Sequence, residues 1–441
     1  MPSPLLRGLL LAVCLVALNA LAVAAPQVQS WQTAKGAKVM YVHAPEIPMV
    51  DVRMVFDAGS ARDGDQPGLA VFTNAVLDQG AGDWDADQIA ERLEDQGVEM
   101  GNGALRDMAW YSVRSLTEPK ALAVALDTLA AVVARPHFAT PDVERVRQQM
   151  QVGLRQSLQS PGTVAQRLFY RTVYGAHPYA HDPSGDPETL AAIGSDRLRA
   201  FHQRHYVARN AVIAIVGAVT REQAAAIAEQ LTAGLPAGEH APPLPPPPQP
   251  SNAEVREDFP SSQTHIYIGQ PGMARHDPDY FPLYVGNHVF GGSSLVSLLG
   301  EEVRNKRGLS YSVYSYFAPM RAAGPFLMSA QTKNAQAPEA IAVMRDTLRR
   351  FITDGPTREE LDAAKRNITG GFPLDIASNK KIVEYIAMMG FYDYPLDWLE
   401  TLVAKVEAVT AEQVRDAFQR RIHPALLAAV VVGGGEPGDR Q

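Results

Sequence analysis

Residues 301–315 read Glu-Glu-Val-Arg-Asn-Lys-Arg-Gly-Leu-Ser-Tyr-Ser-Val-Tyr-Ser. This stretch predicts the end of a helix, a turn at Gly308 and Leu309, and then a strand. Arg304 and Tyr311 lie seven residues apart across that break, so both side chains could face one cavity. A guanidinium and a phenol together suit the binding of a peptide backbone and of an oxyanion. The alternative is a surface arginine in a basic cluster beside a half-buried strand tyrosine.

The sequence around this stretch repeats an earlier part of the chain. Asp127-Thr128-Leu129 recurs as Asp346-Thr347-Leu348, and the apolar run at 212–217 recurs at 428–433. Matches that occur in the same order at a nearly constant offset indicate two copies of one unit. A run of seven prolines within residues 241–250 separates the copies and favours a stiff, extended connector. The alternative is a proline-rich segment that binds a partner.

Each copy is predicted to contain strands followed by helices. Val50, Val52, Met54 and Phe56 alternate with polar residues, the period of a half-buried strand, and residues 264–268 occupy the same place in the second copy. Helix starts are expected at 117–119, and capping boxes at 220–223 and 410–413. The predicted fold class is α+β, with two homologous repeats that are each an antiparallel sheet with helices packed on one face.

The first residues resemble a secretory signal peptide. Arg7 supplies the positive charge, residues 9–18 are apolar, and Ala22-Val-Ala24 is a small-residue cleavage site. The alternatives are a single membrane anchor, for which the apolar run is short of ~20 residues, and a lipoprotein signal at Cys14. The predicted domains are a signal peptide at 1–24, a first domain at 25–240, a linker at 241–252 and a second domain at 253–441. The expected location is the periplasm, without stable insertion into a membrane.

Composition excludes several classes of function. The chain carries 40 Lys and Arg against 48 Asp and Glu, a net charge of −8, which makes nucleic acid an unsuitable partner. Cys14 is the only cysteine and would leave with the signal peptide, so the mature chain would have neither a disulfide nor a thiol nucleophile. About 417 mature residues are too many for one hydrophobic core and indicate two or more domains.

The run from Arg304 to Ser315 resembles the second-half signature of the pitrilysin/insulinase family of zinc peptidases, the inverzincins. The resemblance implies that the two repeats together form half of a clamshell chamber. It also implies that Arg304 binds substrate, that Tyr311 helps to stabilise the tetrahedral intermediate, and that the turn Gly291-Gly292-Ser293 lines the chamber beside the substrate. A plainer interpretation of that turn is the start of a helix capped by Ser293 or Ser294.

The zinc motif of this family is missing. Active members carry H-x-x-E-H on a helix of the first half, in which two histidines bind zinc and the glutamate is the general base. The corresponding residues here are Val71-Phe-Thr-Asn74-Ala75, and neither Val71 nor Ala75 has an atom that could bind zinc. Residues 152–153, where the third ligand would fall, include no acid, and Glu144 is predicted to lie on a solvated face. The sequence therefore predicts that this chain binds no metal.

Two pairs of histidines could in principle replace that site. His177 and His181 lie four residues apart in a proline-containing loop, and His202 and His205 lie three apart near a charged helix end. Both pairs are predicted to be polar surface histidines.

The resemblance and the missing motif together lead to a functional hypothesis. We expect a non-metal-binding, substrate-gripping subunit of a heterodimeric periplasmic zinc metallopeptidase, inactive alone, whose H-x-x-E-H-bearing partner supplies zinc and acts with it on peptides. The alternative is a catalytically inactive homodimer of the same fold that binds peptides or acts as a scaffold. A third possibility, an active enzyme with a rebuilt metal site, predicts stoichiometric zinc in the purified chain.

Overall fold

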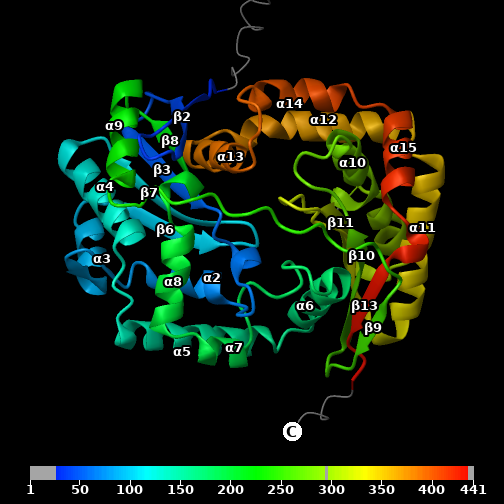
Figure 1. Ribbon diagram of the computed structural model, residues 1–441. Helices are drawn as coiled ribbons and strands as arrows, with labels where there is room; N and C mark the ends of the chain where they lie inside the picture. Colours follow the sequence, from blue (N-terminus) through cyan, green and yellow to red (C-terminus); the bar gives the residue numbers. More distant parts are fainter. Residues whose placement is uncertain (1–25, 294–295, 436–441) are drawn as a thin grey trace, which may run out of the picture.

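Two sheets, one from each half of the chain, organise the protein (Figure 1). The computed structural model describes residues 26–293 and 296–435, so the predicted signal peptide lies outside the described residues. Within the described ranges, no helix combines the length and the apolar composition needed to cross a membrane.

The first sheet has six strands in the order β1-β2-β8-β3-β7-β6. Its neighbouring strands are antiparallel except for β2 and β8, which run parallel. The helices and strands of this half are β1 (Gln29–Gln32), β2 (Lys38–His43), β3 (Met49–Phe56), α2 (Leu69–Val76), β4 (Gly80–Ala81), β5 (Trp84–Asp85), α3 (Ala86–Glu94), β6 (Glu99–Ala104), β7 (Ala109–Leu116), α4 (Pro119–Ala134), α5 (Thr140–Ser157), α6 (Pro161–Tyr174), α7 (Pro187–Ala192), α8 (Ser195–His205), β8 (Ala211–Gly217) and α9 (Arg221–Thr232).

The second sheet has five strands in the order β11-β12-β10-β13-β9, again with one parallel pair, β13 and β9. The elements of this half are β9 (Glu254–Glu257), β10 (Gln263–Pro271), α10 (Tyr280–Asn287), the π-helical turns η4 (His288–Gly292) and η5 (Gly300–Asn305), β11 (Ser310–Phe317), β12 (Pro325–Lys333), α11 (Ala337–Asp354), α12 (Arg358–Asp375), α13 (Asn379–Phe391), α14 (Trp398–Glu407), α15 (Ala411–Arg421) and β13 (Ala428–Val432).

The two halves share a common order of main elements, which confirms the predicted α+β repeat. β3, α4, α5 and β8 of the first half correspond to β10, α11, α12 and β13 of the second. Even single hydrogen bonds recur: the Thr128 hydroxyl donates to Val124 O and the Thr347 hydroxyl to Val343 O, each at 2.7 Å. The capping boxes predicted at Thr220 and Thr410 are both present.

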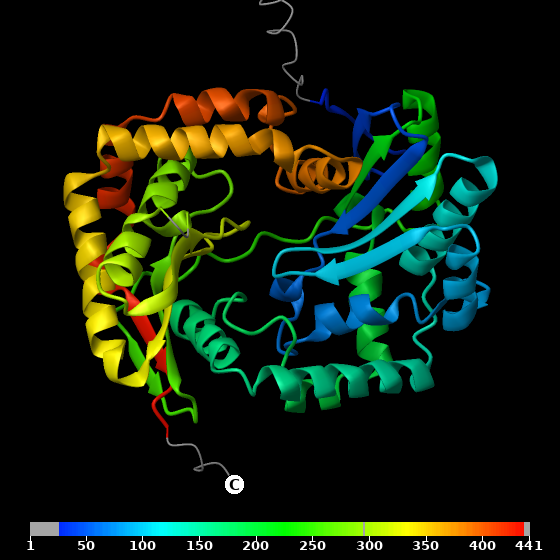
Figure 2. The same ribbon diagram turned by 180° about the vertical axis from the view of Figure 1, so that it is seen from behind.

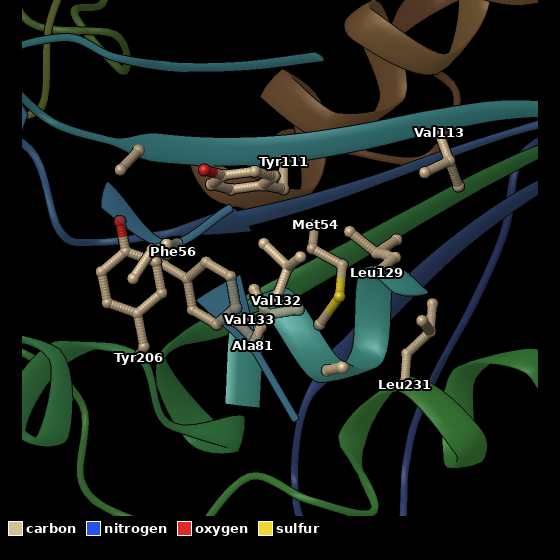
Figure 3. Close-up of a cluster of buried hydrophobic side chains, with 14 of the residues drawn as sticks. Met54, Phe56, Ala81, Tyr111, Val113, Leu129, Val132, Val133, Tyr206 and Leu231 are labelled. Carbon is tan, nitrogen blue, oxygen red and sulfur yellow. The ribbon is translucent and has the colours of Figure 1, made fainter. Parts of the chain in front are cut away.

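The core of the first half lies between its sheet and several helices, among them α4 (Figure 3). β7 alternates fully buried residues with half-buried ones, so Tyr111 and Val113 share the face that meets Leu129 and Val132 of α4. The helix starts where the sequence predicts, because Pro119 occupies its first turn and the preceding glutamate accepts bonds from two backbone amides.

Each sheet is also covered by one helix from the opposite half, an arrangement that the periodicity of the sequence does not reveal (Figures 1 and 2). α6 of the first half packs on β10 and β13, and α13 of the second half packs on β8 and β3. The approach is close: a side chain on Gly390 of α13 would lie 2.6 Å from Val212 of β8. The helices of each half leave part of their own sheet uncovered. The two halves therefore depend on each other to bury both sheets.

A buried carboxylate joins the halves at their seam. Asp107 is 3% exposed and accepts hydrogen bonds from the Tyr179 hydroxyl at 2.5 Å, from the Tyr392 hydroxyl at 2.8 Å and from the Arg321 amide at 2.7 Å. Arg321 lies in the turn that joins β11 to β12, so this carboxylate anchors the far end of that hairpin to the first half.

The proline-rich segment at 241–252 forms neither helix nor strand and lies against the first half. Arg62 donates to Pro242 O at 2.7 Å, and the ring of His177 hydrogen-bonds Pro245 O at 2.9 Å. These contacts hold the connector to the protein surface along part of its length.

Candidate functional site

Arg304 and Tyr311 meet, as their spacing predicts. Arg304 lies in η5, and Gly308 follows with φ of +62°, a left-handed conformation that ends the helical turn. The Gly308 amide donates to Arg304 O at 3.0 Å. The chain then enters β11, and the Arg304 guanidinium carbon lies 5.0 Å from the centre of the Tyr311 ring. We call these two residues the Arg–Tyr pair.

A β-bulge turns Tyr311 out of the sheet. Ser310 pairs with Thr332 and Ser312 pairs with Gln331, so Tyr311 is the extra residue opposite β12. Its side chain is 86% exposed, whereas Ser310 is buried. The tyrosine is therefore not the half-buried strand residue of the alternative interpretation. A phenol placed in this way is free to meet a ligand.

The glycine-rich turn supports the strand that carries the tyrosine. A Cβ on Gly291 would lie 2.3 Å from Ser315 Oγ of β11, so only glycine lets η4 approach this strand. Asn287 reinforces the contact: it donates to Ser315 O at 3.1 Å and accepts from the Ser315 hydroxyl at 2.7 Å. Gly292 is exposed, and Ser293 ends the turn by donating its amide to His288 O at 3.3 Å. The role of this turn beside a substrate stays a prediction.

The helix where the zinc motif would lie is α2, and its residues do not fit a metal ion. Val71 and Ala75 are partly exposed and bear only hydrocarbon side chains. Asn74 is buried, and its amide group reaches toward the Tyr206 hydroxyl at 3.3 Å. Glu144 is exposed on α5 and pairs at 2.9 Å with the mostly buried Arg147, which confirms the predicted place of the glutamate on a solvated face. Across 26–293 and 296–435, no three His, Cys, Asp or Glu residues are grouped so that they could hold a metal ion.

The prediction of surface histidines is wrong for three of the four residues. His177, His202 and His205 are 7%, 8% and 5% exposed. The signal for the last two is present in the sequence: together with Leu198 and Phe201 they form one stripe at helical spacing on α8, and that stripe faces the core. Charged neighbours in the same helix obscured this periodicity.

Backbone carbonyls satisfy these buried rings. The ring of His202 hydrogen-bonds Val133 O at 2.8 Å, and burial lowers the pKa of this histidine. His181 is the half-buried member of the four, and it bonds Ser60 O at 2.9 Å and the buried Asp63 carboxylate at 3.1 Å. The histidines thus act as core and loop residues rather than as a second metal site.

Acidification is expected to destabilise the chain through His205. Burial, with Arg204 and Arg62 next in effect, lowers the pKa of this histidine to about 4, against about 6.5 in an unfolded chain. Between these values the unfolded chain binds a proton that the folded chain does not. The free energy of unfolding should therefore fall by about 3 kcal/mol as the pH falls from 7 to 4.

Urea unfolding at a series of pH values measures this loss of stability. The loss should be smaller in His205→Gln. It should persist in the control His240→Gln, because His240 is exposed. An unaltered pH dependence in His205→Gln would contradict the assignment.

Family models match both halves of the chain. The model described as insulinase, peptidase family M16, matches residues 38–184, and the model described as the peptidase M16 inactive domain matches residues 192–368. A crystal structure of a peptidase M16 inactive domain from Pseudomonas fluorescens is 40% identical, covers 93% of this chain and 99% of its own, and superposes with a TM-score of 0.89. The chain belongs to peptidase family M16. This is the pitrilysin/insulinase family that the sequence resembles.

More distant M16 relatives carry other names. A protein of Streptomyces coelicolor named an uncharacterized zinc protease is 25% identical over 360 residues, which are 79% of this M16 chain and 77% of the relative. A Bacillus subtilis protein of the same description is 23% identical over 404 residues, 91% and 98% of the two chains. A protease structure from Helicobacter pylori, 18% identical over 92% of this chain and 99% of its own, shares the fold with a TM-score of 0.83.

Proposed function

We propose that this M16 chain is the non-metal-binding subunit of a heterodimeric periplasmic zinc metallopeptidase. It holds peptides, and a partner chain with H-x-x-E-H supplies the zinc. The observation that supports this most strongly is the exposed, bulged Tyr311 beside Arg304 in a chain whose α2 presents Val71 and Ala75 where zinc ligands would be. The match to the M16 inactive domain agrees with a non-catalytic subunit.

Each member of the Arg–Tyr pair has a distinct role in this proposal. The Arg304 guanidinium carries a permanent charge and several donors, so it suits a carbonyl or carboxylate of the bound peptide. The Tyr311 hydroxyl is a single donor, and it suits the oxygen that gains negative charge when the peptide carbonyl is attacked. The attack itself takes place on the partner chain.

A scaffold homodimer is the competing hypothesis. A scaffold role does not require an exposed tyrosine that a bulge holds beside an arginine. A subunit that holds peptides requires both side chains. The periplasmic location follows from the signal-like segment at 1–24 and is part of the proposal.

Purification of the tagged chain from its native host is expected to recover a second chain of similar size that contains H-x-x-E-H. Mass spectrometry identifies the partner, and elemental analysis should find about one zinc per pair, with none in the isolated chain. Recovery of a homodimer alone would favour the scaffold. Chelator-sensitive digestion of peptides by the isolated chain would overturn the proposal.

A further inference from the structure

A basic pocket lies between Arg307, which follows Arg304 by three residues, and α11. The cavity has a volume of about 300 Å³ and is lined by Arg307, Val343, Asp346, Arg349 and Arg350. We use the name basic pocket for this cavity together with its cations Lys306, Arg307, Arg349 and Arg350. The mechanism proposed above uses none of them.

Three of these cations share one carboxylate. Glu302 accepts a hydrogen bond from Lys306 Nζ at 3.0 Å and from Arg307 Nη1 at 2.6 Å, and its Oε2 lies 3.6 Å from Arg350 Nη2. The Arg307 bond, then the Lys306 bond, lowers the pKa of Glu302 to about 2. One carboxylate neutralises only one of the three positive charges, so the electrostatic potential around Glu302 remains positive.

The pair of Arg349 and Asp346 does not change the excess of positive charge. Arg349 is bonded to Asp346, so these two charges offset each other. Arg350 is 59% exposed, and within the described ranges no acceptor lies at hydrogen-bonding distance from its guanidinium. The four cations and two carboxylates therefore leave about two positive charges at one place, in a chain whose net charge is −8. The planar fork of arginine matches a carboxylate with two parallel hydrogen bonds.

We propose that the basic pocket binds carboxylate side chains of the same peptide that the Arg–Tyr pair holds, so that the chain prefers peptides with an acidic segment next to the gripped residues. This inference rests on the proposed peptide-holding function. Arg304 and Arg307 are three residues apart at one helical end. An extended peptide advances about 3.3 Å per residue, so a few residues suffice to reach from the pair to the pocket.

The test uses fluorescently labelled twelve-residue peptides and the isolated full chain. One peptide carries three glutamates at one end, a second carries them at the other end, and a third has glutamine at those positions. At low salt, anisotropy titrations should show about tenfold tighter binding of one glutamate peptide than of the glutamine peptide. The double variant Arg307→Gln/Arg350→Gln should lose that preference, and so should the native chain at high salt.

A control variant tests whether the effect belongs to the pocket. Arg358→Gln removes an arginine of α12 whose side chain is 96% exposed, and it should keep the preference for the glutamate peptide. Equal binding of the glutamate and glutamine peptides, or a preference that survives the double variant, would overturn the inference and leave the proposed function standing. Failure of the chain to bind any of the peptides would instead overturn both.

Discussion

Replacing Tyr311 by phenylalanine is expected to lower the turnover of the reconstituted two-chain enzyme about a hundredfold or more. The loss of one hydrogen-bond donor to an oxyanion typically raises the barrier by about 3–4 kcal/mol. The phenyl ring keeps the bulged conformation and the contact with Arg304, so peptide binding should change little. The measurement is kcat and KM of the assembled pair with a peptide substrate, together with its zinc content, which should not change.

The control for this variant is Tyr314→Phe. Tyr314 lies on the same strand, but it is half-buried and stacks on Tyr316 rather than standing free beside Arg304. Its loss should leave kcat within about threefold of the native value, because no reacting oxygen depends on it. If Tyr311→Phe also turned over within that range, Tyr311 would have no part in the chemistry.

Replacing Asp107 by alanine is expected to lower the free energy of unfolding by about 4 kcal/mol. The change leaves the Tyr179 hydroxyl, the Tyr392 hydroxyl and the Arg321 amide without their acceptor, and each buried donor left unpaired costs about 1–3 kcal/mol. The two tyrosines come from opposite halves of the chain, so the lost hydrogen bonds are those that join the two halves. Urea unfolding of the isolated chain measures it.

Asp65→Ala provides the matched control for the seam. Asp65 is exposed, so its removal should change the free energy of unfolding by less than about 0.5 kcal/mol. A loss below about 1 kcal/mol in Asp107→Ala would mean that water replaces the carboxylate at the seam, and would contradict its structural role.

Much of the fold and part of the site could be predicted from the sequence. The strand around Val52, the start of α4 and both capping boxes rest on local patterns, and local patterns survive in any tertiary context that buries one face. The meeting of Arg304 and Tyr311 was also predictable, because only a helical end, one glycine turn and the first residues of a strand separate them.

Other features of the site could not be predicted, for a definite reason. The bulge that exposes Tyr311 depends on how β11 pairs with β12, and the buried state of His205 depends on the core against which α8 packs. The basic pocket joins Arg307 to Arg350, which are far apart in the chain. In each case the partner is distant in sequence, and no local period indicates it.

The sequence by itself determined two things about this protein: that one α+β unit occurs twice, and that the helix where zinc would bind carries no ligand, because a side chain without a donor atom lacks one in every conformation. The tertiary structure alone decided how the halves are joined, through the exchange of α6 and α13 and through Asp107, and which side chains stand free. Those outcomes depend on the path of the chain in space, since burial and hydrogen bonding between distant segments exist only after the sheets have formed.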